Sequence, residues 1–263
     1  MRKIEEVDQT TEIKHVNDLW KKSNEASVIV DLKNGLSLQD IIDKQKIIKP
    51  LAEPNKMVCA DGRCQHNEET FCLAGSGILL PDEDFKQIIK DHGNIKCLTS
   101  HDGCGAGKLA FENFKSQGGI LPENVLTADE FAKWWTKSKA LEYGLDYEHI
   151  GAEKFNDPNH HERGLLINSI TFNPELIKGL PNVFVSDLAS CSKDDNVAKE
   201  ISILTSIAFS DHGFGSRIKE QEPFYIFICA KNKTDQSRLT KITEAAVSNY
   251  GTKVRIEGFF SPY

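Results

Sequence analysis

Three side chains that can bind a metal ion lie at the ends of two apolar segments of the chain. Cys59 belongs to the apolar run 56–60, and His101 and Cys104 follow the apolar run 95–99. A short apolar run that stops at polar, glycine-containing sequence is typical of a buried parallel strand that delivers side chains to a loop at its carboxyl end. Two thiolates and one imidazole suit zinc, and three protein ligands leave a fourth position for water or an anionic ligand. The sequence therefore predicts a zinc hydrase or hydrolase.

The predicted strands must lie side by side for these three side chains to meet. Open parallel sheets bind ligands outside the carboxyl ends of the strands, where the strand order reverses. If the strands 56–60 and 95–99 flank that point, Cys59 lies close to His101 and Cys104 despite their distance in sequence. The His-x-x-Cys spacing lets one tight turn present both ligands to one ion. Alone this spacing is a weak signal, but here a Cys-x-Asp-x-Arg pattern follows the earlier strand.

The two patterns together resemble one known family. Cys-x-Asp-x-Arg at 59–63 with His-x-x-Cys-Gly at 101–105 is similar to the β-class carbonic anhydrases, including their cadmium-using and carbonyl sulfide- or carbon disulfide-hydrolysing relatives. The Ala-Gly pair at 74–75 resembles the Asn-Ala-Gly stretch between those motifs. The resemblance covers residues 56 to about 112, and the family commonly has a serine where Gly62 stands.

The resemblance assigns a role to each residue of these motifs. It implies that Cys59, His101 and Cys104 bind Zn²⁺ and that Asp61 and Arg63 form a catalytic dyad. A metal-bound water has a lowered pKa and supplies hydroxide near neutral pH. Asp61 can accept a hydrogen bond from this water, and Arg63 can keep Asp61 ionised through a bidentate pair.

The resemblance also implies an activity and an assembly. The expected reaction is zinc-dependent hydration of carbon dioxide to bicarbonate by a metal-bound hydroxide, which makes the protein a carbonate dehydratase, a lyase. Two alternatives stay open, namely a carbonyl sulfide or carbon disulfide hydrolase on the same metal site and a catalytically silent zinc-binding protein. Because the family is built on dimers, we expect a homodimer or a higher homo-oligomer.

Composition excludes several other classes of protein. The 263 residues carry a net charge of -7, which argues against a broad nucleic-acid surface because such a surface needs clustered Lys and Arg. No apolar run approaches the roughly 20 residues of a membrane span, and no apolar core of a signal peptide follows Met1. We therefore expect a cytoplasmic protein. The seven cysteines are an odd, scattered set, so a disulfide framework is not expected.

The remaining pattern predicts an α/β fold with a mostly parallel central sheet flanked by helices. Residues 1–55 read as an N-terminal helical arm, in which Ser37 can cap a helix, and residues 56–263 as a single α/β metal-binding domain. The stretch 116–165 is the least readable part, with one helix start at Thr127. Strands are predicted at 56–60, 71–74, 95–99, 182–186, 224–229 and 253–260, and helices near 81–93, 105–114, 127–141, 196–209 and 239–246.

Histidines outside the motifs have more ordinary interpretations. His160 and His161 lie in the polar loop 156–163, where adjacent histidines are more often solvent-exposed than metal ligands or proton shuttles. His66 follows the Asp-x-Arg pair closely and is a somewhat better shuttle candidate. His149 is expected to be an ordinary surface or helix-end residue.

Overall fold

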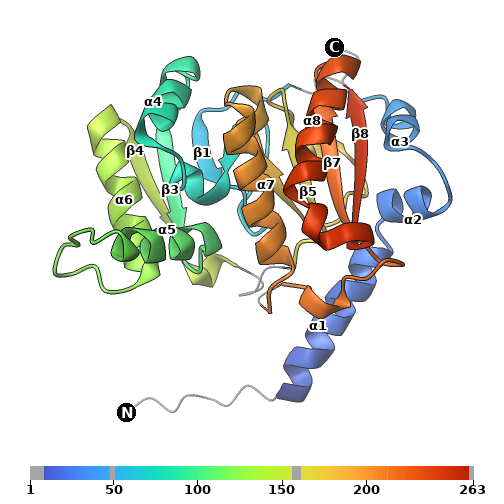
Figure 1. Cartoon of the computed structure of the whole chain (residues 1–263), viewed down its shortest axis with the longest axis horizontal. Coiled ribbons are helices and arrows are strands. Elements are labelled where there is room, and N and C mark those ends of the chain that lie inside the picture. The colour runs from blue at the N-terminus through green and yellow to red at the C-terminus, as the bar shows by residue number, and fades with distance from the viewer. Residues whose placement is uncertain (1–8, 48–50, 156–160, 212, 261–263) are drawn as a thin grey trace.

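The computed structural model describes residues 9–47, 51–155, 161–211 and 213–260 (Figure 1). Its strands form two four-stranded sheets, and every strand pairing is parallel. The first sheet, in the order β2-β1-β3-β4, is built from Lys56–Cys59 (β1), Thr70–Leu73 (β2), Cys97–His101 (β3) and Asp146–Ile150 (β4). The second, in the order β6-β5-β7-β8, is built from Gly164–Asn168 (β5), Val183–Ser186 (β6), Phe224–Ala230 (β7) and Val254–Phe260 (β8).

Eight α-helices of the described residues surround these sheets. They are Gln9–Asn24 (α1), Ser27–Lys33 (α2), Leu38–Gln45 (α3), Asp82–Asp91 (α4), Gly105–Ser116 (α5), Ala128–Tyr143 (α6), Asp194–Ala208 (α7) and Lys233–Ala246 (α8). Helix α6 packs on β3 and β4, while α7 and α8 lie side by side over the second sheet (Figure 1). None of the described helices has both the length and the apolar character of a membrane span.

The predicted α/β class is confirmed, with parallel strands, flanking helices and a helical N-terminal region. The strands divide between two sheets, whereas the sequence pattern predicted one central sheet. One continuous cluster of buried apolar side chains includes Met57 and Leu98 from the first sheet and Leu165 and Ile226 from the second. Both sheets therefore share a core.

Local sequence explains where two of the helices begin. Ser37 accepts a hydrogen bond from the Asp40 backbone N–H, and the Asp40 carboxylate accepts one from the Ser37 backbone. Thr127 and Glu130 form the same reciprocal capping box at the start of α6. Because such boxes pair backbone N–H groups that have no partner within the helix, they fix the first turn. The predicted helix starts at Ser37 and Thr127 are both confirmed.

Strand order places the candidate site at a reversal point. In the first sheet β1 and β3 are neighbours, and the chain continues outward to β2 on one side and to β4 on the other. The carboxyl ends of β1 and β3 thus border the crevice in which open parallel sheets bind ligands. Cys59 is the last residue of β1 and His101 the last residue of β3, so the predicted convergence of these strands is confirmed.

The second sheet meets the first at strand β2. The Asp187 backbone N–H donates to the Cys72 carbonyl at 2.8 Å, and the Cys72 N–H donates to the Asp187 carboxylate at 2.7 Å. The Val185 N–H donates to the Ala60 carbonyl at 2.9 Å. These bonds attach the loop that follows β1 to the second half of the chain.

Two strands were not predicted. Strand β4 has the sequence Asp-Tyr-Glu-His-Ile and is half-exposed at the edge of its sheet, so it lacks the apolar run of a buried strand. Strand β5 is fully buried between β6 and β7. Its apolar core is only the triplet 165–167, which is too short to distinguish a strand from the end of a loop.

Candidate metal centre

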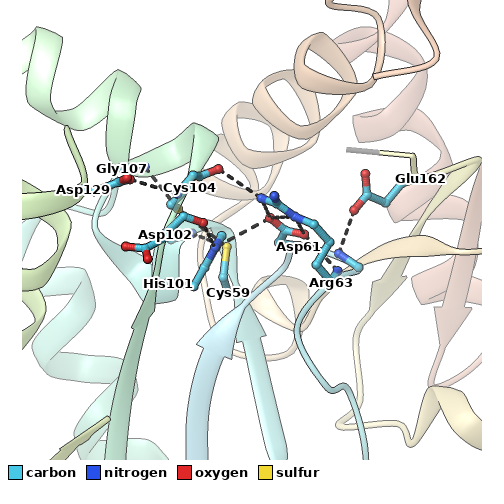
Figure 2. A network of polar contacts seen from close by, with 12 residues as sticks. Cys59, Asp61, Arg63, His101, Asp102, Cys104, Gly107, Asp129 and Glu162 are labelled. Carbon is cyan, nitrogen blue, oxygen red and sulfur yellow. Dashed lines mark hydrogen bonds and ion pairs between the residues drawn. The ribbon is translucent and has the colours of Figure 1, made fainter. Parts of the chain in front are cut away.

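Cys59, His101 and Cys104 lie together in a buried cluster (Figure 2). One donor atom from each residue lies within 4.8 Å of the other two, and the two Sγ atoms are 3.9 Å apart. Cys59 ends β1, His101 ends β3, and Cys104 is the N-cap residue of α5. The structure thus brings together all three residues that the sequence predicted as ligands.

The hydrogen bonds of His101 fit a metal ligand. Its Nδ1 lies 2.9 Å from the Asp102 carbonyl oxygen and donates to it, so a ring in the neutral form would carry its lone pair on Nε2. Nε2 is buried and makes no hydrogen bond in the part of the chain that the structure describes. A buried ring nitrogen without a hydrogen bond is costly, and an ion held jointly with the two sulfurs would remove that cost.

Backbone N–H groups point at both sulfurs. The Gly75 N–H donates to Cys59 Sγ at 3.2 Å, and the Gly107 N–H donates to Cys104 Sγ at 3.3 Å. Such donors stabilise thiolates that bind a metal. Burial raises the pKa of the Cys59 thiol well above its ordinary value, so a nearby cation is needed to keep the thiolate form.

Glycine is required at position 75 for two reasons. Gly75 has a φ of 55°, in the left-handed region, and an added Cβ would lie 2.6 Å from Ile78 Cγ2 and 3.6 Å from Cys104 Sγ. The turn Ala74–Gly77 therefore packs directly against both cysteines of the cluster.

Asp61 and Arg63 form a buried ion pair beside the cluster (Figure 2). Arg63 Nη2 donates to Asp61 Oδ2 at 2.6 Å, and Arg63 Nε donates to Asp61 Oδ1 at 3.0 Å. Burial opposes the charge of Arg63, yet the bonds to Asp61 keep the pKa of the guanidinium above its ordinary value. Asp61 Oδ2 lies 3.6 Å from His101 Nε2. The predicted dyad is therefore paired, and its carboxylate faces the imidazole.

The turn that carries His101 and Cys104 is held by hydrogen bonds from two other segments. Gly103 has a φ of +67°, its N–H donates to Asp129 Oδ1 at 2.9 Å, and its carbonyl accepts from Arg63 Nη2 at 3.0 Å. Motif reasoning did not find Asp129, because its role depends on the packing of α6 against this turn.

Asp102 and His149 were also not predicted as site residues. His149 Nε2 lies 3.1 Å from Asp102 Oδ1, and the Ala152 N–H donates to Asp102 Oδ2 at 3.1 Å. Lys133 Nζ lies 3.0 Å from the same carboxylate. The position of Asp102 directly after a candidate ligand was the available signal. His149 belongs to this network, which corrects the expectation of an ordinary surface residue.

An aromatic side chain lies against both His101 and Arg63. The Phe155 ring meets the His101 ring edge-on at 5.7 Å between centroids, and the Arg63 guanidinium carbon lies 4.9 Å from the Phe155 centroid. A cavity of about 280 Å³ opens beside these residues and is lined in part by Arg63, Ile150 and Phe155. Nothing in the sequence around Phe155 pointed to this role.

Three histidines were considered as alternative ligands or proton shuttles, and the structure describes two of them. His66 is half-buried, its Nε2 lies 2.9 Å from the Cys59 carbonyl oxygen, and burial lowers its pKa. His161 is buried and packs on the Phe214 ring at 5.2 Å, which corrects the expectation of solvent exposure. His160 lies outside the described residues.

Comparisons with protein family models, curated proteins and solved structures found no match to this chain. The fold and the cluster define an α/β protein with parallel sheets and a buried Cys-His-Cys group that can hold a metal ion. These features are consistent with the resemblance to β-class carbonic anhydrases, but they do not identify the chain as a member of that family.

Proposed function

We propose that the protein is a zinc enzyme that hydrates carbon dioxide to bicarbonate. The observation that carries this proposal is the meeting of Cys59, His101 and Cys104 within 4.8 Å, directly beside the paired Asp61 and Arg63. Two thiolates and an imidazole suit zinc better than they suit hard cations, which prefer oxygen ligands. The substrate is proposed from the resemblance of the motifs.

The chain's own residues account for the other requirements of the reaction. Zinc bound here would lower the pKa of a water molecule and so provide a hydroxide nucleophile near neutral pH. Asp61 is placed to accept a hydrogen bond from that nucleophile and to orient it. Arg63 holds Asp61 ionised and in place, and the apolar Phe155 ring lies against the His101 imidazole.

The pairing of Asp61 argues for a catalytic rather than a silent zinc site. A silent site would be expected to use Asp61 or a further cysteine as a permanent fourth ligand. Both carboxylate oxygens instead accept hydrogen bonds from Arg63, at 3.0 Å to Oδ1 and 2.6 Å to Oδ2. This geometry supports an Asp61 that accepts a hydrogen bond from the nucleophile and does not bind the metal ion.

Stopped-flow measurement of carbon dioxide hydration at alkaline pH, with purified zinc-loaded protein, tests the proposal. We expect hydration well above the buffer rate, and loss of that rate after zinc is removed by a chelator. The same protein should be assayed for hydrogen sulfide release from carbonyl sulfide and carbon disulfide. Sulfide release without carbon dioxide hydration would show that the substrate is carbonyl sulfide or carbon disulfide. Inactivity in both assays would contradict the proposal that the protein is an enzyme of this kind.

A further inference from the structure

Glu162, in the segment before β5, connects the second half of the chain to the Asp-x-Arg loop. Its side chain is 1% exposed, and Oε1 accepts a hydrogen bond from the Gly62 backbone N–H at 2.9 Å (Figure 2). Gly62 lies between the two members of the dyad. No motif marks Glu162, because its contact with Gly62 joins positions that are distant in sequence.

The backbone of Gly62 is also pressed against the start of β6. A Cβ at this position would lie 2.6 Å from Asn182 Oδ1 and 2.8 Å from the Val183 carbonyl oxygen. Such separations are shorter than real Cβ contacts, so only glycine fits here without a shift of the loop. A serine side chain would therefore not fit at this position without such a shift.

Glu162 itself is held firmly in place. The next residue, Arg163, donates its backbone N–H to the Asn182 carbonyl at 2.7 Å. The Arg163 side chain is fully buried, with its guanidinium carbon 4.3 Å from the Trp20 ring centroid. The chain is therefore anchored directly after Glu162, and from this anchored position the Glu162 carboxylate can hold the loop whose Gly62 N–H it accepts.

We infer that Glu162 is a positioning residue that holds the 61–63 loop so that Arg63 stays paired with Asp61. The inference rests on the proposed function, because the paired dyad matters only if Asp61 acts on a reaction beside a bound ion. Asp61 Oδ2 is 3.6 Å from His101 Nε2, so an Asp61 released from Arg63 would lie within reach of that ion.

Two conservative variants separate the hydrogen bond from the charge. Glu162→Gln removes the charge but keeps an oxygen that can accept the Gly62 N–H. Glu162→Asp keeps the charge but withdraws the carboxylate by one methylene. The inference predicts that Glu162→Gln resembles the wild type and that Glu162→Asp is defective. Glu244→Asp makes the same chemical change at an exposed position on α8 and is the control.

The first measurement is hydrogen exchange of the Gly62 amide in the metal-free full-length protein. Loss of a buried hydrogen bond should raise this exchange rate by about tenfold or more in Glu162→Asp. Glu162→Gln and Glu244→Asp should remain close to the wild type. Wild-type exchange in Glu162→Asp, or equally fast exchange in Glu162→Gln, would overturn the inference.

The second measurement is the visible absorption spectrum of the cobalt(II)-substituted protein. If Asp61 leaves Arg63 and approaches the ion, the spectrum of Glu162→Asp should differ from that of the wild type, while Glu162→Gln should not. An unchanged spectrum and hydration rate in Glu162→Asp would overturn the role of Glu162 in holding the dyad. If the wild type takes up no cobalt, the proposed function fails, and Gly62 exchange still decides whether Glu162 holds the loop.

Discussion

The Asp61 carboxylate lies between a guanidinium and an imidazole, and its chemistry follows from that position. Arg63 engages both of its oxygens, while Oδ2 is 3.6 Å from His101 Nε2. An ionised carboxylate that already has a cationic partner can accept one further hydrogen bond without having to bind the metal ion. In the proposed function, the Cys-His-Cys cluster would therefore bind the metal ion, and Asp61 would orient the nucleophile without binding the ion.

Substitution of Asp61 tests this separation. Asp61→Asn should retain one zinc ion per chain but lower kcat for hydration on the order of 100-fold, because the amide is a weaker acceptor and pairs poorly with Arg63. Zinc analysis and stopped-flow kinetics on the same preparation measure both effects. Full activity of Asp61→Asn would contradict the proposed role of Asp61 in orienting the nucleophile. Loss of zinc from this variant would instead indicate that Asp61 is itself a metal ligand.

Substitution of Cys59 tests metal binding. A metal ion that binds only the folded chain stabilises it, so loss of a ligand should lower metal affinity and stability together. Added zinc should raise the midpoint of thermal unfolding of the wild type but not that of Cys59→Ser. Cys229→Ser is the matched control, since Cys229 is fully buried outside the cluster. This control should lose stability and still bind one zinc, and a zinc response equal to the wild type in Cys59→Ser would contradict the assignment.

At the scale of elements, one buried carboxylate on α7 connects the turn after β2 with the end of β6. The Ala74 N–H donates to Glu200 Oε2 at 3.2 Å, and the Ser186 hydroxyl donates to Glu200 Oε1. Ala74 begins the turn whose Gly75 N–H points at Cys59. Burial raises the pKa of Glu200 to about 7 and that of Asp187 to about 7. Helix α7 thus supports the turn beside the metal cluster through a group that titrates near neutral pH.

Glu200 should make stability depend on pH. The folded state keeps the Glu200 proton up to a pKa of about 7, whereas the unfolded chain releases it near the ordinary value of 4.5. Glu200 therefore lowers the free energy of unfolding as pH rises from about 5 to 8. Glu200→Gln can keep both hydrogen bonds and lacks this loss, so its stability relative to the wild type should increase over that range. Urea unfolding at both pH values measures the difference, and a constant difference would contradict the shifted pKa.

The sequence predicts an element best when burial gives that element a continuous apolar run. Strands β1 and β3 are mostly buried, so they read as apolar runs, and their ends revealed all three candidate ligands and the dyad. Strand β4 lies at an edge, and its two apolar positions are separated by Glu148 and His149, so neither an apolar run nor a regular alternation marks it. Asp129, Phe155 and Glu162 support the site only through packing between distant segments, and no local pattern encodes such contacts.

At the scale of the whole molecule, the N-terminal helix is attached through a buried cation. The Arg163 guanidinium carbon lies 4.3 Å from the Trp20 centroid and 5.5 Å from the Tyr225 centroid, between α1 and β7. Burial lowers the pKa of Arg163 to about 10. Trp20 also packs edge-on against Phe214, with 4.8 Å between the ring centroids.

Periodicity in the sequence did not predict two features of the whole molecule, namely its division into two sheets joined at β2 and the attachment of α1. The homo-oligomeric state stays a prediction.

Removal of the Trp20 side chain should loosen this attachment. Trp20→Ala should lower the free energy of unfolding by roughly 2 kcal/mol, because it removes an aromatic contact and exposes a buried guanidinium. Ile13→Ala on the same helix is the control. Ile13 is 60% exposed, so its loss should cost less than about 0.5 kcal/mol. Equal effects of the two variants in urea unfolding would show that α1 does not depend on the Arg163 contact.

X-ray absorption at the zinc edge, together with metal analysis, shows directly whether Cys59, His101 and Cys104 bind one ion together. We expect one zinc per chain with two sulfurs at about 2.3 Å and a nitrogen at about 2.0 to 2.1 Å. In Cys104→Ser the sulfur contribution should fall by half or the zinc should be lost. A chain that binds no zinc, or zinc surrounded by oxygen and nitrogen alone, would contradict the account.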